Sequence, residues 1–508
     1  MKETVFKNRV NLFIFSFILF SIGSVCISFF PPNEPQYADA ALRMIETGNY
    51  IIPFFNCHVR FDKPILYYLE LVIPFKMFFV DEFIKSGHDP LCIIEYAARL
   101  PSIIASSFIM ILTYSLSNNF FKDKNISINS VIALLSFFFY FYLTRAVYPD
   151  ASLILFEFAA IYFFIKNRYI IAWIFVALGF LTKGPIGIVL PGFTYFIYLW
   201  VVEQKSGIKE LFSTKNIFGF IVFLIISTPW YITMYNQYGM EFINKFLIYH
   251  NIERFTGKAH QHPHSFFYYI PVILVVSYMW IGYSKQLIDK INIKDKNNLF
   301  LLLWAGWIIL FFSISKNKLA HYIAPSFIPI AILFGRYMET LKNTKRIQIG
   351  MFIFEILLGI GLSIYAYIAH LIYLIPTALF GLFFMALINF TESTDRMFFK
   401  KVIAFHIIAS IILMQFEMYR PEKRIWKAVV NNTISLYEYK IRNNTLVAYT
   451  RSCLKPINNL KELQRLPKPF YLYTRVKYIK ELSLFKHKTI LFYARDKGKN
   501  AVFMLIDG

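Results

Sequence analysis

Long apolar runs separated by short, basic loops constrain this chain more than any other feature of its sequence. Hydrophobic residues make up 57% of its 508 residues and charged residues only 16%, whereas about a quarter of a soluble protein is charged. The runs predict an all-α polytopic membrane protein with about thirteen transmembrane helices. The predicted spans lie near residues 10–30, 100–118, 128–146, 150–165, 170–182, 185–202, 216–236, 266–284, 298–314, 322–337, 348–369, 372–390 and 402–418.

The segment 65–80 decides the sidedness of every later loop. It is apolar, but it is short for a span and contains Glu70 and Pro74, so we expect a surface helix. The basic loop at 122–124 then lies in the cytoplasm with the other Lys- and Arg-rich connections. The first external loop, 31–99, and the C-terminus lie outside. These basic loops explain much of the net charge of +23 without a nucleic-acid partner.

The four cysteines do not form an obvious disulfide framework. Cys57 and Cys92 fall in the same predicted external loop, where they either pair or remain free thiols. Cys26 lies within the first predicted span, and Cys453 lies near the C-terminus. The pattern leaves both alternatives open.

The composition changes at about Met418, which separates a transmembrane domain, 1–418, from a second domain, 419–508. The second domain alternates short apolar runs with polar stretches, which predicts a small external α/β domain. We expect strands at 446–449, 470–473, 490–493 and 502–506, and helices near 425–437 and 459–466. The domain is strongly basic, which suits an anionic outer surface or glycolipid, or simply a solubilising cap.

The stretch from Phe30 to Pro64 is the most polar long segment of the first half of the chain. Asn33 is a suitable N-cap, and Gly48 a suitable stop, for an amphipathic helix beside the membrane. A charged group, R-F-D-K, follows directly before Pro64. The stretch therefore places an acid at the start of a surface helix and a basic cluster after its end.

Three pieces of this stretch resemble a known family. P-N-E-P-Q-Y-A, M-I-E-T-G-N-Y-I-I-P and R-F-D-K-P are similar, in order and spacing, to the first external loop of glycosyltransferases that use polyprenyl-phosphate sugars. More narrowly, the stretch resembles the aminoarabinose transferase branch of the protein-mannosyltransferase superfamily. The resemblance extends over about 31–335. It implies a GT-C fold in a bacterial inner membrane, with the active site and C-terminus in the periplasm. It also implies inverting transfer of a sugar from undecaprenyl phosphate to lipid A or another envelope acceptor.

The resemblance implies that Glu34 and Asp150 serve the reacting centre, since paired carboxylates suit transfer at an anomeric carbon. Asp150 lies where one predicted span ends and the next begins, a place where an acid can also simply be solvated. The family commonly has Asp-Glu where this chain has Asn33-Glu34. Either Glu34 is the base, or the acceptor is an already ionised phosphate that needs none.

The resemblance also implies a donor-phosphate site. Lys63 in R-F-D-K-P and Tyr322 in K-L-A-H-Y match family positions that face the phosphate, and Arg60 can assist. An ammonium group offers three donors and a full charge to a phosphate. Without the resemblance, Lys63 would be an interfacial lysine and Tyr322 an aromatic-belt residue.

Asp62 and His262 form a candidate site for a divalent metal ion, although no cofactor is required by the motifs. His262 lies in H-Q-H-P-H, and imidazole and carboxylate groups are zinc ligands. Histidines at alternate positions in a loop are also common without a metal. Two further segments match the family: H-N-I-E-R-F, at 250–255, and L-T-K-G-P-I-G, which contains Lys183. The second segment has a structural interpretation, since Gly184 and Gly187 permit close approach of helices.

Two other classes of function fit the composition. A transporter or flippase of an envelope lipid would place ionisable residues near the middle of the membrane and show repeated halves. A receptor-like or assembly protein would carry no chemistry. The enzyme interpretation predicts that the polar motifs, although far apart in sequence, converge on one external site.

Overall fold

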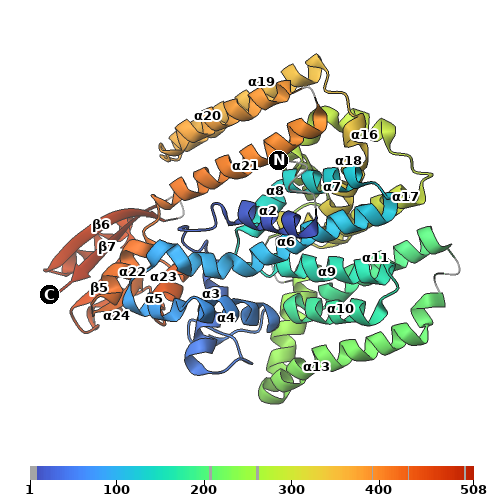
Figure 1. The fold of residues 1–508 in the computed structure, drawn as a ribbon. Coiled ribbons are helices and arrows are strands. Elements are labelled where there is room, and N and C mark those ends of the chain that lie inside the picture. Colours follow the sequence, from blue (N-terminus) through green and yellow to red (C-terminus); the bar gives the residue numbers. More distant parts are fainter. Residues whose placement is uncertain are drawn as a thin grey trace.

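The computed structural model describes residues 8–204, 207, 209–258, 262–391, 393–432, 434–496 and 499–507. Long helices that run in roughly the same direction form the body of the molecule, and a small sheet lies beyond their ends (Figure 1). The helices of the body are α2 (Arg9–Ser21), α6 (Ile93–Phe121), α7 (Lys124–Ser136), α8 (Phe138–Thr144), α9 (Asp150–Ile165), α10 (Tyr169–Lys183), α11 (Ile186–Tyr198), η2 (Leu199–Glu203), η3 (Lys209–Phe212), α13 (Thr214–Phe242), η4 (Ile243–Glu253), α14 (Arg254–Thr256), η5 (Phe266–Tyr268), α15 (Tyr269–Val276), η6 (Tyr278–Tyr283), α16 (Ser284–Lys290), α17 (Lys296–Ile314), η7 (Ala320–Ser326), α18 (Phe327–Tyr337), η8 (Met338–Thr340), α19 (Lys345–Ile368), α20 (Leu374–Leu387), η9 (Ile388–Phe390) and α21 (Thr394–Glu417).

Helices occupy every predicted span, which confirms the multi-pass helical class. By length and composition, the described residues contain six helices able to cross a membrane. The number rises to eight if two bent helix pairs each count as one span, and three shorter apolar helices remain. One bent pair is α7 with α8, at 71°, and the other joins 266–276 to 278–290, at 84°. Several predicted spans are thus short or broken helices.

The first predicted span, 10–30, is helical only as far as Ser21. Gly23 adopts a left-handed backbone conformation, with a φ of 75°, which ends the helix. Beyond this point the backbone carbonyl oxygens no longer accept hydrogen bonds within a helix, so they need hydrogen-bond donors from elsewhere. Arg99 supplies them by donating to the carbonyl oxygens of Ser24 and Ile27.

The first loop contains α3 (Glu34–Thr47), the hairpin β1 (Phe54–Phe55) and β2 (His58–Val59), α4 (Leu66–Met77) and α5 (Val80–Ser86). The helices expected after Asn33 and over 65–80 are confirmed. Asn33 occupies the N-cap position, but its side chain makes no capping hydrogen bond.

Asp39 lies on the polar face of the amphipathic helix α3, and it is fully buried. Its carboxylate accepts hydrogen bonds from Arg43, at 2.9 Å, and from Arg451 of the C-terminal domain, at 3.1 Å. The C-terminal domain thus covers this face, and sequence periodicity could not reveal the cover.

The C-terminal domain is α/β, as predicted, and its sheet has five strands in the order β4-β3-β5-β7-β6. Strands β4, β3 and β5 are parallel, and β5, β7 and β6 are antiparallel. Its elements are α22 (Glu422–Val430), β3 (Ser435–Tyr439), α23 (Asn444–Thr450), β4 (Pro456–Ile457), α24 (Leu460–Gln464), β5 (Phe470–Arg475), η10 (Val476–Tyr478), η11 (Glu481–Leu484), β6 (Lys488–Asp496) and β7 (Lys499–Ile506).

Two predicted elements of this domain are wrong. The residues expected to form a strand at 446–449 belong instead to α23. Asn443 caps the start of this helix, because its side-chain oxygen accepts a hydrogen bond from the Thr445 amide. The helix expected over 425–437 stops at Val430, and β3 follows. A short apolar run does not by itself distinguish a buried helix from a strand.

Two disulfides, Cys26–Cys92 and Cys57–Cys453, correct the expectation for the cysteines. The suggested Cys57–Cys92 pair is absent because Cys26 lies outside the first helix, next to α6, and the C-terminal domain packs on the first loop. The Asn56 side chain also donates to the Leu454 carbonyl oxygen, at 2.8 Å. Since the two regions are in direct contact, they lie on the same side of the membrane.

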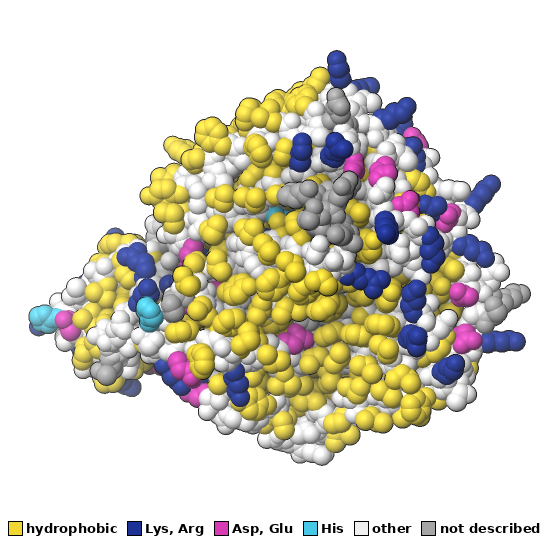
Figure 2. Space-filling model, viewed as in Figure 1, with side chains coloured by type: hydrophobic (Ala, Val, Ile, Leu, Met, Phe, Trp, Pro, Cys, Tyr) yellow, Lys and Arg dark blue, Asp and Glu magenta, His cyan; other side chains and the backbone are white. Residues whose placement is uncertain are grey.

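Hydrophobic side chains cover the middle of the face shown in Figure 2, over the long helices. Lys and Arg side chains gather along the side that lies away from the C-terminal domain. Exposed apolar residues of this kind include Ile225 on α13, Leu357 on α19 and Phe380 on α20. An apolar belt between polar ends is the surface that a bilayer requires.

We expect peptide mapping of the unreduced protein to find Cys26 linked to Cys92 and Cys57 linked to Cys453. The Cys453→Ser variant should lower the free energy of unfolding by about 2–4 kcal/mol, since the lost cross-link closes a long loop. Recovery of a Cys57–Cys92 peptide, or of free thiols in the unreduced protein, would contradict the packing of the C-terminal domain on the first loop.

Candidate active site

Segments that are far apart in the sequence meet at the end of the bundle that faces the C-terminal domain. They are the R-F-D-K residues after β2, the start of α9, the end of α10, the junction of η4 with α14, and the start of η7. The contacts described below join each segment to at least one of the others. These five segments therefore converge, whereas Glu34 and His262, described below, lie apart from them.

Asp150 is the first residue of α9 and lies buried among groups from other segments. Its Oδ1 accepts a hydrogen bond from Lys183 Nζ at 2.7 Å and lies 3.6 Å from His321 Nε2. The Lys183 ammonium also lies 5.0 Å from the centre of the Tyr322 ring. Asp150 thus links α9 to the ends of α10 and η7.

Lys183 is held in place by a close approach of backbones. The Gly187 backbone lies so near Gly179 that an added Cβ would come within 2.3 Å of a Gly179 backbone atom. Gly184 turns the chain with a φ of 79° and lies against Phe246 of η4. The L-T-K-G-P-I-G sequence therefore permits the helix packing expected of it and also directs Lys183 towards Asp150.

Arg60 and Asp62 form a two-pronged ion pair. Arg60 Nη2 donates to Asp62 Oδ2 at 2.7 Å, and Arg60 Nε donates to Asp62 Oδ1. The guanidinium group lies 4.5 Å from the Tyr37 ring centre, and its Nη1 has no hydrogen-bond partner. The aspartate holds the pKa of Arg60 above its ordinary value, and Arg60 holds the pKa of Asp62 below its own, in both cases against the effect of burial.

Lys63 is mostly buried, and its Nζ donates to the Asp62 carbonyl oxygen at 2.8 Å. Burial lowers the pKa of this ammonium to about 8, against the opposing attraction of Asp62. The positive charges of Arg254, Lys183 and Arg60 act in the same direction as burial. The cations from three separate segments are therefore close enough to repel one another.

We call these residues the charged cluster. It comprises four cations and two carboxylates: Arg60, Lys63, Lys183, Arg254, Asp62 and Asp150. Excess buried positive charge is costly unless an anion compensates it. Donor nitrogens on two members, Arg60 Nη1 and Arg254 Nε, are also buried without partners. This combination fits a phosphate, which accepts charge-assisted hydrogen bonds.

Glu34 lies apart from this excess charge, because its carboxylate is already occupied. Oε2 accepts from the Phe30 amide at 2.9 Å and from Arg99 at 3.1 Å, and Oε1 accepts from the Val147 amide at 3.0 Å. Glu34 and Arg99 are both 1% exposed. The carboxylate thus ties the first loop to α6 and to the segment that leads into Asp150.

The candidate metal pair is not assembled. Asp62 is held by Arg60, and His262 is exposed, with its carbonyl oxygen accepting from the Lys318 amide at 3.1 Å. Within the described part of the chain, the one group of three side chains spaced to bind a metal is Asp89, Cys92 and Glu95. Cys92 is in a disulfide, and Lys423 bonds to Glu95. In the described part of the chain, the side chains of this group are thus not all available to a metal ion.

Sequence reasoning gave no role to Arg99 or Arg254. Arg99 lies at the edge of an apolar run, where a buried arginine needs an acidic partner. The sequence could therefore have indicated that such a partner exists, but not that it is Glu34. Arg254 lies in the H-N-I-E-R-F motif, but its proximity to Lys63 depends on how η4 folds back over the first loop.

The buried pair predicts a stability defect. Glu34→Gln should lower the free energy of unfolding by about 3–5 kcal/mol, since it leaves the buried Arg99 without its counter-charge. The control is Asp81→Asn, which removes a pair with the exposed Lys85 and should cost less than about 1 kcal/mol. Thermal unfolding in detergent measures both. Equal melting temperatures for the two variants would show that Glu34 does not hold the loops together.

Comparisons with known proteins identify a similar family, similar sequences and similar structures. Residues 94–232 match the model of the dolichyl-phosphate-mannose-protein mannosyltransferase family. An uncharacterized protein of Aquifex aeolicus is 29% identical, over 94% of this chain and 95% of its own length. The undecaprenyl phosphate-alpha-4-amino-4-deoxy-L-arabinose arabinosyl transferase of Wigglesworthia glossinidia brevipalpis is 28% identical, over 83% of this chain and 77% of its own.

Solved structures share the fold over nearly the whole chain. The crystal structure of ArnT from Cupriavidus metallidurans bound to undecaprenyl phosphate superposes with a TM-score of 0.77 at 19% identity, over 98% of this chain and 99% of that one. The apo structure of the same protein gives a TM-score of 0.74 at 18% identity. The fold that the first-loop motifs implied is thereby confirmed: this chain has the GT-C fold, and it is similar in sequence to aminoarabinose transferases over most of its length.

Proposed function

We propose that this protein transfers an amino sugar from undecaprenyl phosphate to lipid A or another envelope acceptor, with inversion at the anomeric carbon. The observation that carries the proposal is the buried excess of positive charge in the charged cluster. Its members come from the same motifs that resemble the family. The names of the relatives supply the lipid carrier and the amino sugar.

The charged cluster is suited to hold the donor phosphate and the leaving group. In the transfer, the bond between the anomeric carbon and the phosphate oxygen breaks, and its electron pair remains on undecaprenyl phosphate. Lys63 and Arg254 would stabilise the charge that develops there, with Tyr322 donating a neutral hydrogen bond. Arg60 keeps one N–H free for the same anion while the rest of its guanidinium holds Asp62.

Asp150 is the carboxylate best placed to serve the acceptor. A hydroxyl acceptor would lose its proton to Asp150 as the new bond to the anomeric carbon forms. A phosphate acceptor is already ionised, and Asp150 would then only orient it together with Lys183 and His321. Glu34, whose two oxygens both accept hydrogen bonds from neighbouring segments, enters the proposal as a positioning residue.

The periplasmic side of a bacterial inner membrane suits this arrangement. Lys and Arg side chains gather at the end away from the C-terminal domain (Figure 2), as expected for cytoplasmic loops. Two disulfides lie at the opposite end, and disulfides persist in the oxidising periplasm. The domain boundary at about 418 would then separate the spans from a periplasmic domain that clasps the first loop.

Lys63→Ala should reduce kcat/KM for an undecaprenyl-phosphate sugar about ten- to a hundredfold, because one charge-assisted hydrogen bond is lost. The matched control is Lys76→Ala, which removes an exposed lysine of the same loop that lies near Tyr50. An in vitro transfer assay with folded variants measures both. An equal decrease of kcat/KM in the two variants would show that Lys63 is an interfacial anchor and does not bind the donor phosphate.

The same lysine predicts a pH dependence. Its ammonium is charged below a pKa of about 8 and loses its proton above it, so kcat/KM for the donor should fall as the pH rises through about 8. The arginine of Lys63→Arg keeps its charge across this range. In this variant kcat/KM should therefore not decline as the pH rises through about 8, even if its absolute value is lower. A decline of the same shape in the arginine variant would assign it to another group.

A further inference from the structure

His321 lies near the start of η7, directly beside Asp150. Its Nε2 is 3.6 Å from Asp150 Oδ1, the oxygen that also accepts from Lys183. The imidazole ring stands between Tyr142 and Tyr148, whose ring centres are 6.1 and 5.9 Å away. The His321 side chain keeps 15% of its surface exposed. The ring is therefore fixed beside the reacting centre without being fully enclosed.

The imidazole of His321 has a nitrogen that can accept a proton. A neutral imidazole carries one N–H donor and one nitrogen with a lone pair. Neither ring nitrogen forms a hydrogen bond with another residue in the part of the chain that the structure describes. Burial lowers the pKa of His321 below its ordinary value. Asp150 opposes this shift, whereas Lys183 and Arg254 add to it. The ring is therefore uncharged at neutral pH.

Asp150 itself is poorly suited to keep a proton. Its Oδ1 accepts from the Lys183 ammonium at 2.7 Å, and a cation at this distance stabilises the ionised form of a carboxylate. A proton that stayed on Asp150 would also leave the Lys183 ammonium without its counter-charge. A neighbouring group that is neutral before the transfer can hold the proton at a lower cost.

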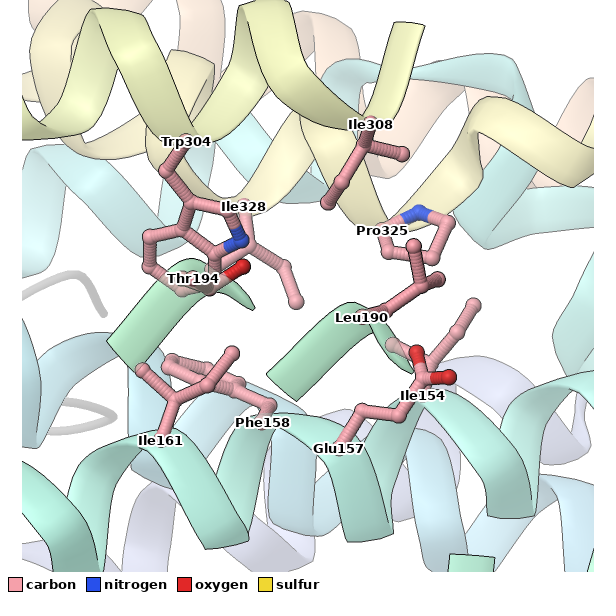
Figure 3. A pocket seen from close by; sticks show the side chains of 10 residues that line it. All are labelled: Ile154, Glu157, Phe158, Ile161, Leu190, Thr194, Trp304, Ile308, Pro325 and Ile328. Carbon is pink, nitrogen blue, oxygen red and sulfur yellow. The ribbon is translucent and has the colours of Figure 1, made fainter. Parts of the chain in front are cut away.

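Other groups near Asp150 are less suitable proton acceptors than His321. The Lys183 ammonium offers only donors, and both oxygens of Glu34 accept hydrogen bonds from neighbouring segments. Glu157 lies about two helical turns, or about 10 Å, further along α9, where it lines a cavity among the helices (Figure 3). That cavity has about 10 Å³ of water-accessible space, room for about one water molecule. One water does not bridge such a distance, so Glu157 has no path to the proton.

We propose that His321 receives, through Asp150, the proton that a hydroxyl acceptor loses during the transfer. The inference rests on the proposed function and specifies its acceptor, which is a hydroxyl group of an envelope glycolipid. A phosphate acceptor is already ionised at neutral pH and has no proton to pass on. An uncharged imidazole also gives a phosphate no positive charge to bind, whereas it serves a hydroxyl acceptor as a proton acceptor.

Bonds and protons balance in this step. The acceptor oxygen forms the bond to the anomeric carbon with an electron pair of its own, and its O–H bond breaks. The bond from the anomeric carbon to the phosphate oxygen breaks at the same time, and that electron pair stays on undecaprenyl phosphate. The proton moves to the Asp150 carboxylate and then to Nε2 of His321. Their separation of 3.6 Å is long for a hydrogen bond, and catalytic contacts often shorten when substrate is bound. The imidazolium finally releases the proton to water.

The test uses one donor, an undecaprenyl-phosphate 4-amino-4-deoxy pentose, and two acceptors. One acceptor is lipid A, and the other is lipid A from which a phosphatase has removed the phosphate groups. We expect the wild type to glycosylate the dephosphorylated acceptor, with the sugar located on a hydroxyl oxygen by mass spectrometry. His321→Gln should lower kcat for this acceptor about a hundredfold or more. Transfer by the wild type to phosphate groups only, or a loss of less than about tenfold in His321→Gln, would overturn the inference.

His264→Gln is the matched control. His264 is another histidine that packs on a tyrosine, with its ring centre 4.1 Å from that of Tyr268. It is exposed and lies in the loop before η5. This variant should keep the wild-type kcat with both acceptors. An equal loss of kcat in His264→Gln and His321→Gln would show that His321 acts through packing alone.

The pH dependence of kcat separates proton transfer from packing. For the dephosphorylated acceptor, kcat of the wild type should fall as the pH drops through the pKa of His321, because the protonated ring accepts no further proton. Burial places that pKa below the ordinary histidine value of about 6.5. The titratable and charged groups that face the ring are Asp150 of α9, Lys183 of α10, Arg254 of α14, Tyr142 of α8, Tyr148 and Tyr322.

The tyrosines, the lysine and the arginine of this set ordinarily titrate far above this range, which leaves the ring and Asp150. His321→Gln should therefore lose the fall of kcat at low pH. A fall of the same shape in His321→Gln would assign it to Asp150 and overturn the inference.

Thermal unfolding in detergent checks that the variants are folded. If His321→Gln melts earlier than the wild type, His321→Asn, whose amide also accepts no proton at these pH values, replaces it in both measurements. Failure of the wild type to transfer the sugar to either acceptor would contradict the proposed function, and the inference with it.

Discussion

The ion pair between Glu34 and Arg99 is the contact on which the arrangement of this protein most depends. One carboxylate binds Arg99, the Phe30 amide and the Val147 amide, and Arg99 in turn binds carbonyl groups beyond α2. The pair thereby fixes the entry to the first loop, the start of α6 and the segment leading to Asp150. A buried pair with both partners satisfied is costly to break, so it sets the geometry that the charged cluster needs.

A second constraint is the excess of cations that this geometry brings together. Arg60 pairs with Asp62, which also lies 3.9 Å from Lys63 Nζ, and Lys183 pairs with Asp150, so two carboxylates serve the four cations of the cluster. Such a site is better satisfied with an anion than without one. The C-terminal domain contributes by clasping the hairpin that precedes Arg60, through Cys57–Cys453. This disulfide joins the external domain to the loop that carries Arg60.

The motifs and the hydrophobic pattern sufficed to predict the fold class and the helical character of the spans, although several spans are short or broken. They also pointed to most of the segments that meet at the charged cluster. They failed where an outcome depended on contacts between distant segments. Asp39 looked solvent-exposed because nothing in its helix reveals that Arg451 covers it. Cys26 looked membrane-embedded until the helix ended at Ser21. Glu157 lies within an apolar run, and only the packing of four helices around it shows that its carboxylate has no partner.

The central claim is that the charged cluster holds the donor phosphate. The most direct measurement is an experimental structure of the protein in lipid nanodiscs with undecaprenyl phosphate added. The account predicts phosphate density within hydrogen-bonding distance of Lys63 Nζ and the Arg254 guanidinium, with the Arg60–Asp62 pair intact. A phosphate seated elsewhere, with Lys63 and Arg254 unchanged from the ligand-free arrangement, would contradict it.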